Sequence, residues 1–190
     1  MDVDDFWSKN KLELQISLFK EKKVGLVYSN FYKFYNGKKK LAYKNILPSG
    51  KITSQIIKNY QIGILTVVLR KSLLNKKKLF DFKYDLLSDY DFILNFSLKH
   101  HFDVVNQPLA YYRIHENQLQ KKKMVIQAKQ FWEWFEKKKI KNKYRKFDLS
   151  AINKKYEYFS LLKEINNSKI ILFVKILKKF SFLNFIKICA

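Results

Sequence analysis

Residues 24–43, VGLVYSNFYKFYNGKKKLAY, set the fold class of this chain. Val24 to Tyr28 is a short apolar run that predicts a buried strand, and Asn30 to Tyr35 continues in extended form. Asn36-Gly37 is a strong hairpin-turn signal, and Leu41 to Tyr43 is expected to be the returning strand. We therefore expect a sheet at the centre of the domain.

Helical and extended patterns alternate on both sides of this hairpin. Leu12, Ile16 and Phe19 recur at helical spacing, which predicts a helix that ends near residues 21–23. Gly63 to Arg70 is the most apolar and β-branched run and is expected to be a strand. The mixture of both periodicities indicates an α/β protein.

Residues 52–115 also alternate between helical and extended patterns. A short helix is expected over 52–59, and an apolar helix with acidic residues in its first turn is expected from Ser88 to Leu98. Residues 102–105 and 108–115 are expected to be two further extended stretches.

The composition is that of a folded protein with a basic surface. The 190 residues are 47% hydrophobic and 17% aromatic, and 39 Lys+Arg oppose 16 Asp+Glu for a net charge of +23. Lysine dominates together with Asn, Ile and Phe, which is typical of an AT-rich genome, so we discount part of the charge as a functional signal. Such a surface still attracts phosphate groups.

Composition also bounds the compartment. A single cysteine, Cys189, excludes an internal disulfide framework and fits a reducing compartment. The acidic N-terminus does not resemble a secretory signal, and no uninterrupted apolar run reaches the roughly 18–20 residues that span a bilayer. We expect a cytoplasmic protein, bound peripherally to the inner face of the cell membrane.

The charge predicts two regions, residues 1–120 and 121–190. The first holds 20 basic and 11 acidic residues, and the second holds 19 and 5. The second region alternates lysine-rich helical patterns with aromatic clusters, and its stretch 170–188 is amphipathic and cationic. It is expected either to lie on an anionic membrane surface or to be a helical extension that packs on the first region.

Three polar groups are candidates for chemistry. Asp2-Val3-Asp4-Asp5 places carboxylates at i and i+2, so both can bind one hard divalent cation. Ser88-Asp89-Tyr90-Asp91 begins a predicted helix, and Tyr112-Arg113-Ile114-His115 ends a predicted strand. Each group also has a structural interpretation. The first could be a solvated chain end, the acidic residues of the second are favoured by the helix dipole, and the histidine of the third could be structural.

Taken together and in order, these groups resemble family 2 glycosyltransferases of the GT-A fold. The resemblance runs through Asp2 to Trp7, Asn10-Lys11-Leu12-Glu13-Leu14-Gln15, Gly25 to Asn30, Val68-Leu69-Arg70-Lys71-Ser72, Phe80-Asp81, Asp89-Tyr90-Asp91 and Tyr111 to Asn117. It covers about residues 1–120. It implies a partial GT-A-type mixed sheet flanked by helices, followed by a basic helical C-terminal extension.

The resemblance implies a donor site for a nucleotide-diphosphate sugar. Asp4 would bind a divalent cation, Mn or Mg, and Asp2 would lie near the ribose of the nucleotide. His115 would lie near the metal and the diphosphate, as a ligand or a hydrogen-bond donor. Arg113 would contact the diphosphate or bind a helix end.

The resemblance also implies an acceptor side. Asp89 would be the general base that takes the proton of the acceptor hydroxyl, in a displacement that inverts the anomeric centre. Ser88 and Asp91 would lie beside it. The sequence departs from the family here, because Ser88 replaces a glutamate and Asn95 replaces an arginine.

In the family, the strands that hold the donor nucleotide precede the Asp-x-Asp motif. We therefore expect a partial domain that lacks its nucleotide-binding half, and a separate chain that supplies this half is one candidate partner. The expected acceptor is a glycan or a lipid-linked glycan.

Three functions stay open from the residues. The first is a glycosyltransferase, or a fragment of one, in cell-surface polysaccharide synthesis. The second is an inactive, truncated glycosyltransferase-like protein that binds a membrane or a partner. The third is a nucleic-acid-binding protein, motivated by the charge and interleaved aromatic residues. This third function does not explain the ordered motifs, so nucleic acid is disfavoured.

Overall fold

The structure, a computed structural model, describes residues 4–74, 79–114 and 124–164. The chain divides into two compact units, one of residues 1–83 with 88–118 and the other of residues 84–87 with 119–190. The first unit carries the sheet and the second is helical, so the predicted α/β class with a helical C-terminal part is confirmed. The domain boundary near residue 120 stays a prediction, because residues 115–123 lie outside the described part.

The sheet of the first unit is mixed. Its five strands are β1 (Phe6–Trp7), β2 (Val24–Tyr35), β3 (Lys38–Leu41), β4 (Val68–Leu69) and β5 (His101–Arg113). The order is β1-β5-β2-β3, and β4 pairs with β2. The central strands β2 and β5 are parallel, whereas the other pairs are antiparallel.

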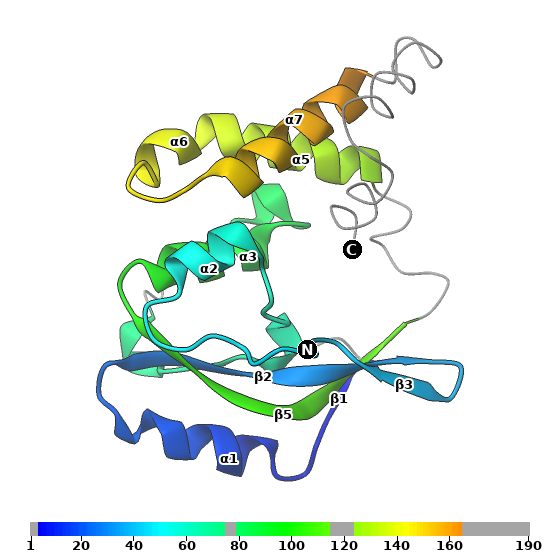
Figure 1. Cartoon of the computed structure of the whole chain (residues 1–190), viewed down its shortest axis with the longest axis vertical. Coiled ribbons are helices and arrows are strands. Elements are labelled where there is room, and N and C mark those ends of the chain that lie inside the picture. The colour runs from blue at the N-terminus through cyan, green and yellow to red at the C-terminus, as the bar shows by residue number, and fades with distance from the viewer. Residues whose placement is uncertain (1–3, 75–78, 115–123, 165–190) are drawn as a thin grey trace. The chain divides into compact units, whose positions relative to one another are not determined.

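Helices cover both faces of this sheet. They are α1 (Lys11–Ser17), α2 (Thr53–Lys58) and α3 (Ser88–Ser97), with 3-10 turns η1 (Leu18–Lys20), η2 (Ile64–Thr66), η3 (Lys71–Leu73) and η4 (Phe82–Tyr84). Helix α1 lies on one side of the sheet, and α2 and α3 lie on the other (Figure 1). The predicted helices over 52–59 and 88–98 are confirmed.

The core of this unit lies on the two central strands. Leu26, Val27 and Tyr28 of β2 are fully buried, as are Phe102 and Ala110 of β5. Burial of a large apolar side chain contributes about 1.5–3 kcal/mol relative to exposure. The sheet is therefore anchored by the parallel β2–β5 pair.

The predicted hairpin forms, but its returning strand is Lys38–Leu41 and not the predicted 41–43. Asn36 and Gly37 adopt φ angles of 46° and 74°, which is the left-handed geometry of a tight turn between twisted strands. Strand β3 pairs with the second half of β2, from Tyr32 opposite Leu41 to Tyr35 opposite Lys38. The two extended runs of residues 24–35 are one continuous strand.

Residues 101–113 also form one strand where the sequence predicts two. Val105 is paired with Ser29 and Pro108 with Asn30, so two extra residues of β5 form an irregularity. Proline has no N–H to give to a ladder and is tolerated at such bulges. Asn106 in this bulge accepts a hydrogen bond of 2.8 Å from the backbone N–H of Leu47.

The strand predicted over 63–70 is mostly wrong. Residues 64–66 form the 3-10 turn η2, and only Val68–Leu69 pair with β2. The hydroxyl of Thr66 donates to the carbonyl of Gly63 at 2.7 Å. Side chains from elsewhere bind the next carbonyls, Trp7 to Leu65 at 2.8 Å and Gln15 to Thr66 at 2.8 Å. These tertiary contacts outweigh the β propensity of the run.

Helix α1 exists as predicted, but its apolar residues face solvent. Leu12 is 44% exposed and Ile16 is 58% exposed, whereas Lys11 and Gln15 are fully buried. The Gln15 amide donates to the carbonyls of Val27 and Thr66, which fixes this polar side of the helix against the fold. The periodicity therefore identified the helix but not its buried face.

Arg70 ties the start of β2 to the end of the first helical segment. Its guanidinium donates to the carbonyls of Val24 at 2.9 Å, Phe19 at 2.7 Å and Glu21 at 3.1 Å. Its backbone N–H donates to Gly25. The arginine that sequence comparison placed after a strand is therefore a structural residue in this fold.

The second unit is built from α5 (Met124–Lys137), α6 (Ile140–Lys143) and α7 (Ser150–Glu164). Phe131, Trp134 and Tyr158 are fully buried, and the rings of Phe131 and Phe159 lie 5.2 Å apart. In the described part of the chain, no helix is both long and apolar enough to cross a membrane. The predicted cationic stretch 170–188 lies outside the described residues.

Candidate functional site

The acidic run at the N-terminus is held against the end of β5. Asp4 is half-buried in a turn, and Asp5 is buried. A carboxylate oxygen of Asp5 accepts a hydrogen bond of 3.1 Å from the backbone N–H of Arg113. Strand β1, which follows at once, pairs Phe6 with Tyr111. The fold therefore brings the predicted metal motif beside the predicted Tyr-Arg-Ile-His segment, 108 positions away in sequence.

The side chain of Arg113 lies among aromatic rings. Its guanidinium carbon is 5.9 Å from the ring centre of Phe6 and 6.0 Å from that of Phe34. Phe6 also stacks on Tyr111 at 4.4 Å, and Tyr111 contacts Tyr32 at 5.4 Å. These cross-strand pairs stabilise this end of the sheet. Diphosphate contact by Arg113 stays a prediction.

Asp89 lies in the first turn of α3 and is half-buried. Its carboxylate accepts a hydrogen bond of 2.7 Å from the backbone N–H of Tyr90. Burial raises the pKa of Asp89, and the backbone N–H groups of Tyr90 and Asp89 partly oppose that shift. A carboxylate with a raised pKa is a stronger base, which suits general-base chemistry near neutral pH.

The two residues predicted beside Asp89 differ in exposure. Ser88 begins α3 and is half-buried, whereas Asp91 is only 6% exposed. The amide of Asn95 donates to the backbone carbonyl of Asp91 at 2.6 Å and to its carboxylate at 3.0 Å. Asp91 therefore fixes the helix start locally, and acceptor contact by Ser88 or Asp91 stays a prediction.

Tyr60, just after α2, lies against the start of α3. Its ring is perpendicular to that of Tyr90, with the centres 5.0 Å apart. Its hydroxyl oxygen is buried and has no hydrogen-bond partner among the described residues. Burial raises the pKa of Tyr60 well above its ordinary value, and the charge of Asp89 adds to that shift. Tyr60 is thus a neighbour of the predicted base.

The segment 60–66 connects the two carboxylate groups of the site. Tyr60 lies beside Asp89, and Leu65 accepts the indole N–H of Trp7, two residues after Asp5. Five residues of extended chain span at most about 17 Å. Among the described residues Asp89 itself contacts neither Asp4 nor Arg113. The two parts are therefore linked by one short segment and do not form a single contact cluster.

Two of the predicted donor-site residues, Asp2 and His115, lie outside the described residues. In the ranges 4–74, 79–114 and 124–164, no group of three or more His, Cys, Asp or Glu side chains is arranged to hold a metal ion. Asp4 supplies one carboxylate, which is the ligand type that Mg²⁺ and Mn²⁺ prefer. The metal ligands among the described residues are therefore compatible with a hard cation, but Asp4 alone does not complete a metal site.

Lys11 and Gln15 form a buried polar pair behind this site. The ammonium of Lys11 lies 4.1 Å from the ring centre of Trp7, and neither Lys11 Nζ nor Gln15 Oε1 has a hydrogen-bond partner in the described ranges. Burial lowers the pKa of Lys11 to about 8. The pair sits one helical turn apart on α1, beside the segment that links the two carboxylate groups.

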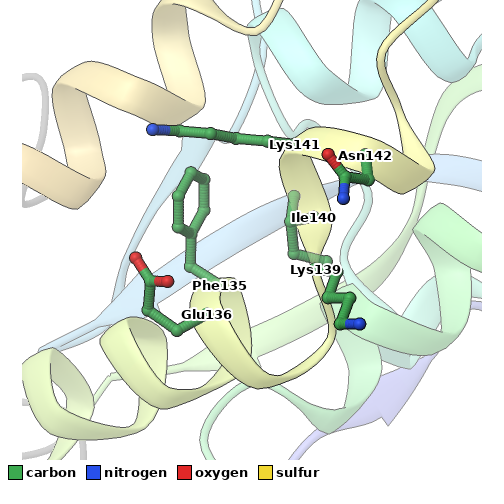
Figure 2. Close-up of a pocket in the computed structure, with 6 residues that line it drawn as sticks. All are labelled: Phe135, Glu136, Lys139, Ile140, Lys141 and Asn142. Carbon is green, nitrogen blue, oxygen red and sulfur yellow. The ribbon is translucent and has the colours of Figure 1, made fainter.

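A separate hollow lies in the helical unit, at the turn between α5 and α6. It is lined by Phe135, Glu136, Lys139, Ile140, Lys141 and Asn142. Figure 2 shows Phe135 and Ile140 on its two sides, with the Lys141 chain extending across one end. Its lining includes none of the residues that sequence predicts to be functional, so we assign no activity to it.

Sequence reasoning missed Tyr60 and Lys11 as residues of interest. Tyr60 follows a short helix, and nothing in its sequence neighbours predicts that it lies near Asp89, 29 positions later. For Lys11 a weak signal exists, since Lys11 and Gln15 are spaced i and i+4 and share one side of the helix. An exposed lysine is the ordinary expectation at such a position.

Comparison with known proteins adds a chemical class to this geometry. Ninety residues, 47% of this chain, are 36% identical to UDP-Glc:alpha-D-GlcNAc-diphosphoundecaprenol beta-1,3-glucosyltransferase WfgD of Escherichia coli. The chain is glycosyltransferase-like. The matched stretch spans 34% of that protein, about a third of its length. No protein-family model matches the chain.

Proposed function

We propose that this chain carries the acceptor side and part of the metal site of a family 2, GT-A-type glycosyltransferase. It would transfer a sugar from a nucleotide-diphosphate sugar to a glycan or lipid-linked acceptor. The observation that carries the proposal is the 36% identity over 90 residues to a protein named as a glucosyltransferase. The mixed sheet, with Asp89 beside one face and Asp4 at its end, supports it.

The proposed chemistry is an inverting displacement. The acceptor oxygen forms a bond to the anomeric carbon as the bond from that carbon to the diphosphate oxygen breaks. The acceptor proton passes to the Asp89 carboxylate, whose raised pKa favours proton uptake. The nucleoside diphosphate leaves with the electron pair.

The leaving group accumulates negative charge, which a divalent cation would neutralise when bound. Asp4 would hold that cation, together with Asp2 and His115 outside the described residues. Arg113, at the same end of the sheet, would supply a further positive charge. The buried Asp5 keeps the acidic run in place through its hydrogen bond to the Arg113 backbone.

The printed name of the Escherichia coli relative specifies a UDP-glucose donor and a diphosphoundecaprenol-linked acceptor. By analogy we propose that the acceptor of this chain is lipid-linked and that the reaction belongs to cell-surface polysaccharide synthesis. The basic second region would then lie near an anionic membrane surface on the cytoplasmic side.

A second candidate is a glycosyltransferase-like protein that binds a membrane or partner without turnover. The observation that favours it lies on the predicted acceptor side, where Ser88 replaces a glutamate and Asn95 replaces an arginine of the family pattern.

The test measures binding and transfer separately on the full chain. Calorimetry with UDP-glucose and Mn²⁺ reports donor binding, and radiolabelled transfer to a diphosphate-linked N-acetylglucosamine lipid reports turnover. Asp4→Ala is expected to weaken donor binding at least about tenfold, since a metal ligand is lost. Asp89→Asn is expected to lower turnover by about 10²–10⁴-fold with unchanged donor binding, because only the base is removed.

Asp148→Asn is the matched control, because Asp148 is exposed in the helical unit and its carboxylate accepts the backbone N–H of Ser150. Its binding and turnover should equal those of the wild type. Donor binding without transfer would favour the inactive candidate. A folded chain that binds no nucleotide sugar would contradict both the donor site and the proposed activity.

A further inference from the structure

A buried hydroxyl without a partner lies beside the proposed base. The Tyr60 hydroxyl oxygen is excluded from solvent, and no described residue hydrogen-bonds to it. Such groups are rare in folded proteins, because an unpaired buried polar atom is costly, and a catalytic role is one explanation for them. The ring itself is well packed, perpendicular to Tyr90 at 5.0 Å. The unpaired group is therefore the hydroxyl alone.

The Asp89 carboxylate, in turn, lacks a side-chain hydrogen-bond donor among the described residues. It accepts backbone N–H groups from Tyr90 and from its own residue, and within the described ranges no cation or side-chain donor faces it. An ionised carboxylate has about four acceptor positions. One half-buried acceptor thus lacks a side-chain donor while one buried donor beside it lacks an acceptor.

The packing of α2 on α3 places the two groups together. At one end of the pair, the hydroxyls of Thr53 and Ser97 are 3.0 Å apart, and Thr53 also donates to the Ser97 carbonyl. Thr53 begins α2 and Ser97 ends α3, so the helices are antiparallel. The residues just after α2 therefore meet the first turn of α3, which is where Tyr60 and Asp89 lie.

We propose that Tyr60 is the positioning residue of Asp89: its hydroxyl donates a hydrogen bond to the Asp89 carboxylate and holds it in the orientation that accepts a proton. The structure shows no hydrogen bond between the two groups, so the proposed bond forms by rotation of the Asp89 side chain while the Tyr60 ring keeps its packing against Tyr90. This role rests on the proposed function, because it gives Asp89 the task of a base.

The groups that face this pair support the direction of donation. Burial, with Asp89, Tyr90 and Tyr43 as further causes, raises the pKa of Tyr60 well above its ordinary value, so the phenol keeps its proton at neutral pH. Burial, with the charge of Asp91 as a further cause, also raises the pKa of Tyr90. Tyr60 is therefore a permanent donor, and Asp89 is the group of the pair that titrates.

The opposing interpretation is that Tyr60 is only a packed aromatic residue. Tyr60→Phe separates the two, because phenylalanine keeps the ring against Tyr90 and removes only the hydroxyl. A donated hydrogen bond favours the ionised carboxylate, so its loss raises the pKa of Asp89. A purely structural tyrosine leaves that pKa unchanged.

The experiment is a carboxyl-carbon NMR titration of the full chain labelled at aspartate, with Asp89→Asn used to assign the signal. In Tyr60→Phe the Asp89 pKa is expected to rise by about one unit, a tenfold change in proton affinity. Tyr32→Phe is the matched control, because Tyr32 is half-buried on the aromatic row of the sheet, where it contacts Tyr111. It should leave the Asp89 signal unshifted.

An Asp89 pKa that is equal in wild type and Tyr60→Phe overturns the proposal, as does an equal shift in Tyr32→Phe. This readout needs no turnover, so it stands apart from the proposed function. If the chain transfers sugar, the acidic limb of the kcat profile should also move to higher pH in Tyr60→Phe. Transfer with an unmoved limb would leave Asp89 as the base and remove Tyr60 from its support.

Discussion

Replacing Lys11 by methionine should stabilise this protein at neutral pH. Lys11 is fully buried, its amine has no hydrogen-bond partner in the described part of the chain, and burial lowers its pKa from 10.5 to about 8. Below about pH 8 the amine is charged in both the folded and unfolded states, and the folded state bears the cost of burying that charge. Methionine has a similar length and flexible shape without the charge.

The magnitude follows from the two pKa values. The change of the Lys11 pKa from 10.5 to about 8 corresponds to about 3 kcal/mol near pH 7, where both states are protonated. The cation–π contact of the Lys11 ammonium with the Trp7 ring offsets about 0.5–2 kcal/mol of this charge-burial cost. We therefore expect Lys11→Met to raise the free energy of unfolding by about 1–3 kcal/mol near pH 7.

The stability difference between Lys11→Met and the wild type should become smaller as the pH rises. Between about pH 8 and pH 10.5 the unfolded chain holds the Lys11 proton and the folded chain releases it, so wild-type stability gains in this window. Near pH 9.5 the remaining charge cost is about 1 kcal/mol, so the difference between variant and wild type should fall by about 2 kcal/mol. Tyrosines that titrate in the same range affect both proteins alike and cancel in the difference.

The assay is urea unfolding followed by tryptophan fluorescence near pH 7 and pH 9.5. Lys9→Met is the control, because Lys9 is exposed two residues earlier, and it should change stability by less than about 0.5 kcal/mol at either pH. A Lys11→Met gain that does not depend on pH would refute the charge argument. Destabilisation at both values would show that the amine is paired in solution.

Two further substitutions test the scaffold. Arg70→Ala should lower the free energy of unfolding by about 2–4 kcal/mol, since three backbone carbonyls lose a charged donor, and Arg70→Lys should recover only part of it; urea unfolding of both variants checks this. Gly25→Ala should cost about 1–3 kcal/mol, because its new Cβ would lie 2.8 Å from the Cβ of His100, and a melting temperature equal to wild type would contradict this close packing.

Local chemistry made part of the fold predictable. Asn36-Gly37 fixes its turn through backbone geometry, and the acidic first turn of α3 follows from the helix dipole, so both were predicted from the sequence. The sheet itself follows from the apolar run at 24–28. In each case the determining residues are neighbours in sequence.

The sequence-based predictions are wrong where side chains that are distant in sequence determine the local structure. Gly63 to Arg70 has strand propensity, but Trp7 and Gln15 bind its carbonyls and hold a 3-10 turn. The buried face of α1 is set by the same contacts, so periodicity pointed to the wrong side. No local pattern encodes these long-range hydrogen bonds.

The candidate site divides in the same way. Asp4 and Asp89 were found because each belongs to a short motif whose spacing carries meaning, whereas the proximity of Tyr60 to Asp89 depends on how two helices pack. Asp2 and His115 lie outside the described residues, so their predicted roles stay predictions. The sequence therefore identifies the motifs, and the structure shows which other residues lie next to them.

The parallel pairing of β2 with β5 has a consequence for how the chain is made. The end of β2 at Tyr35 and the end of β5 at Arg113 are 78 residues apart, and the central pair of the sheet cannot close until both exist. At about 5–20 residues per second, a ribosome needs roughly 4–16 s to make the intervening chain. During that interval the apolar first half of β2 has no partner on one edge, so aggregation is a risk while the chain is being made.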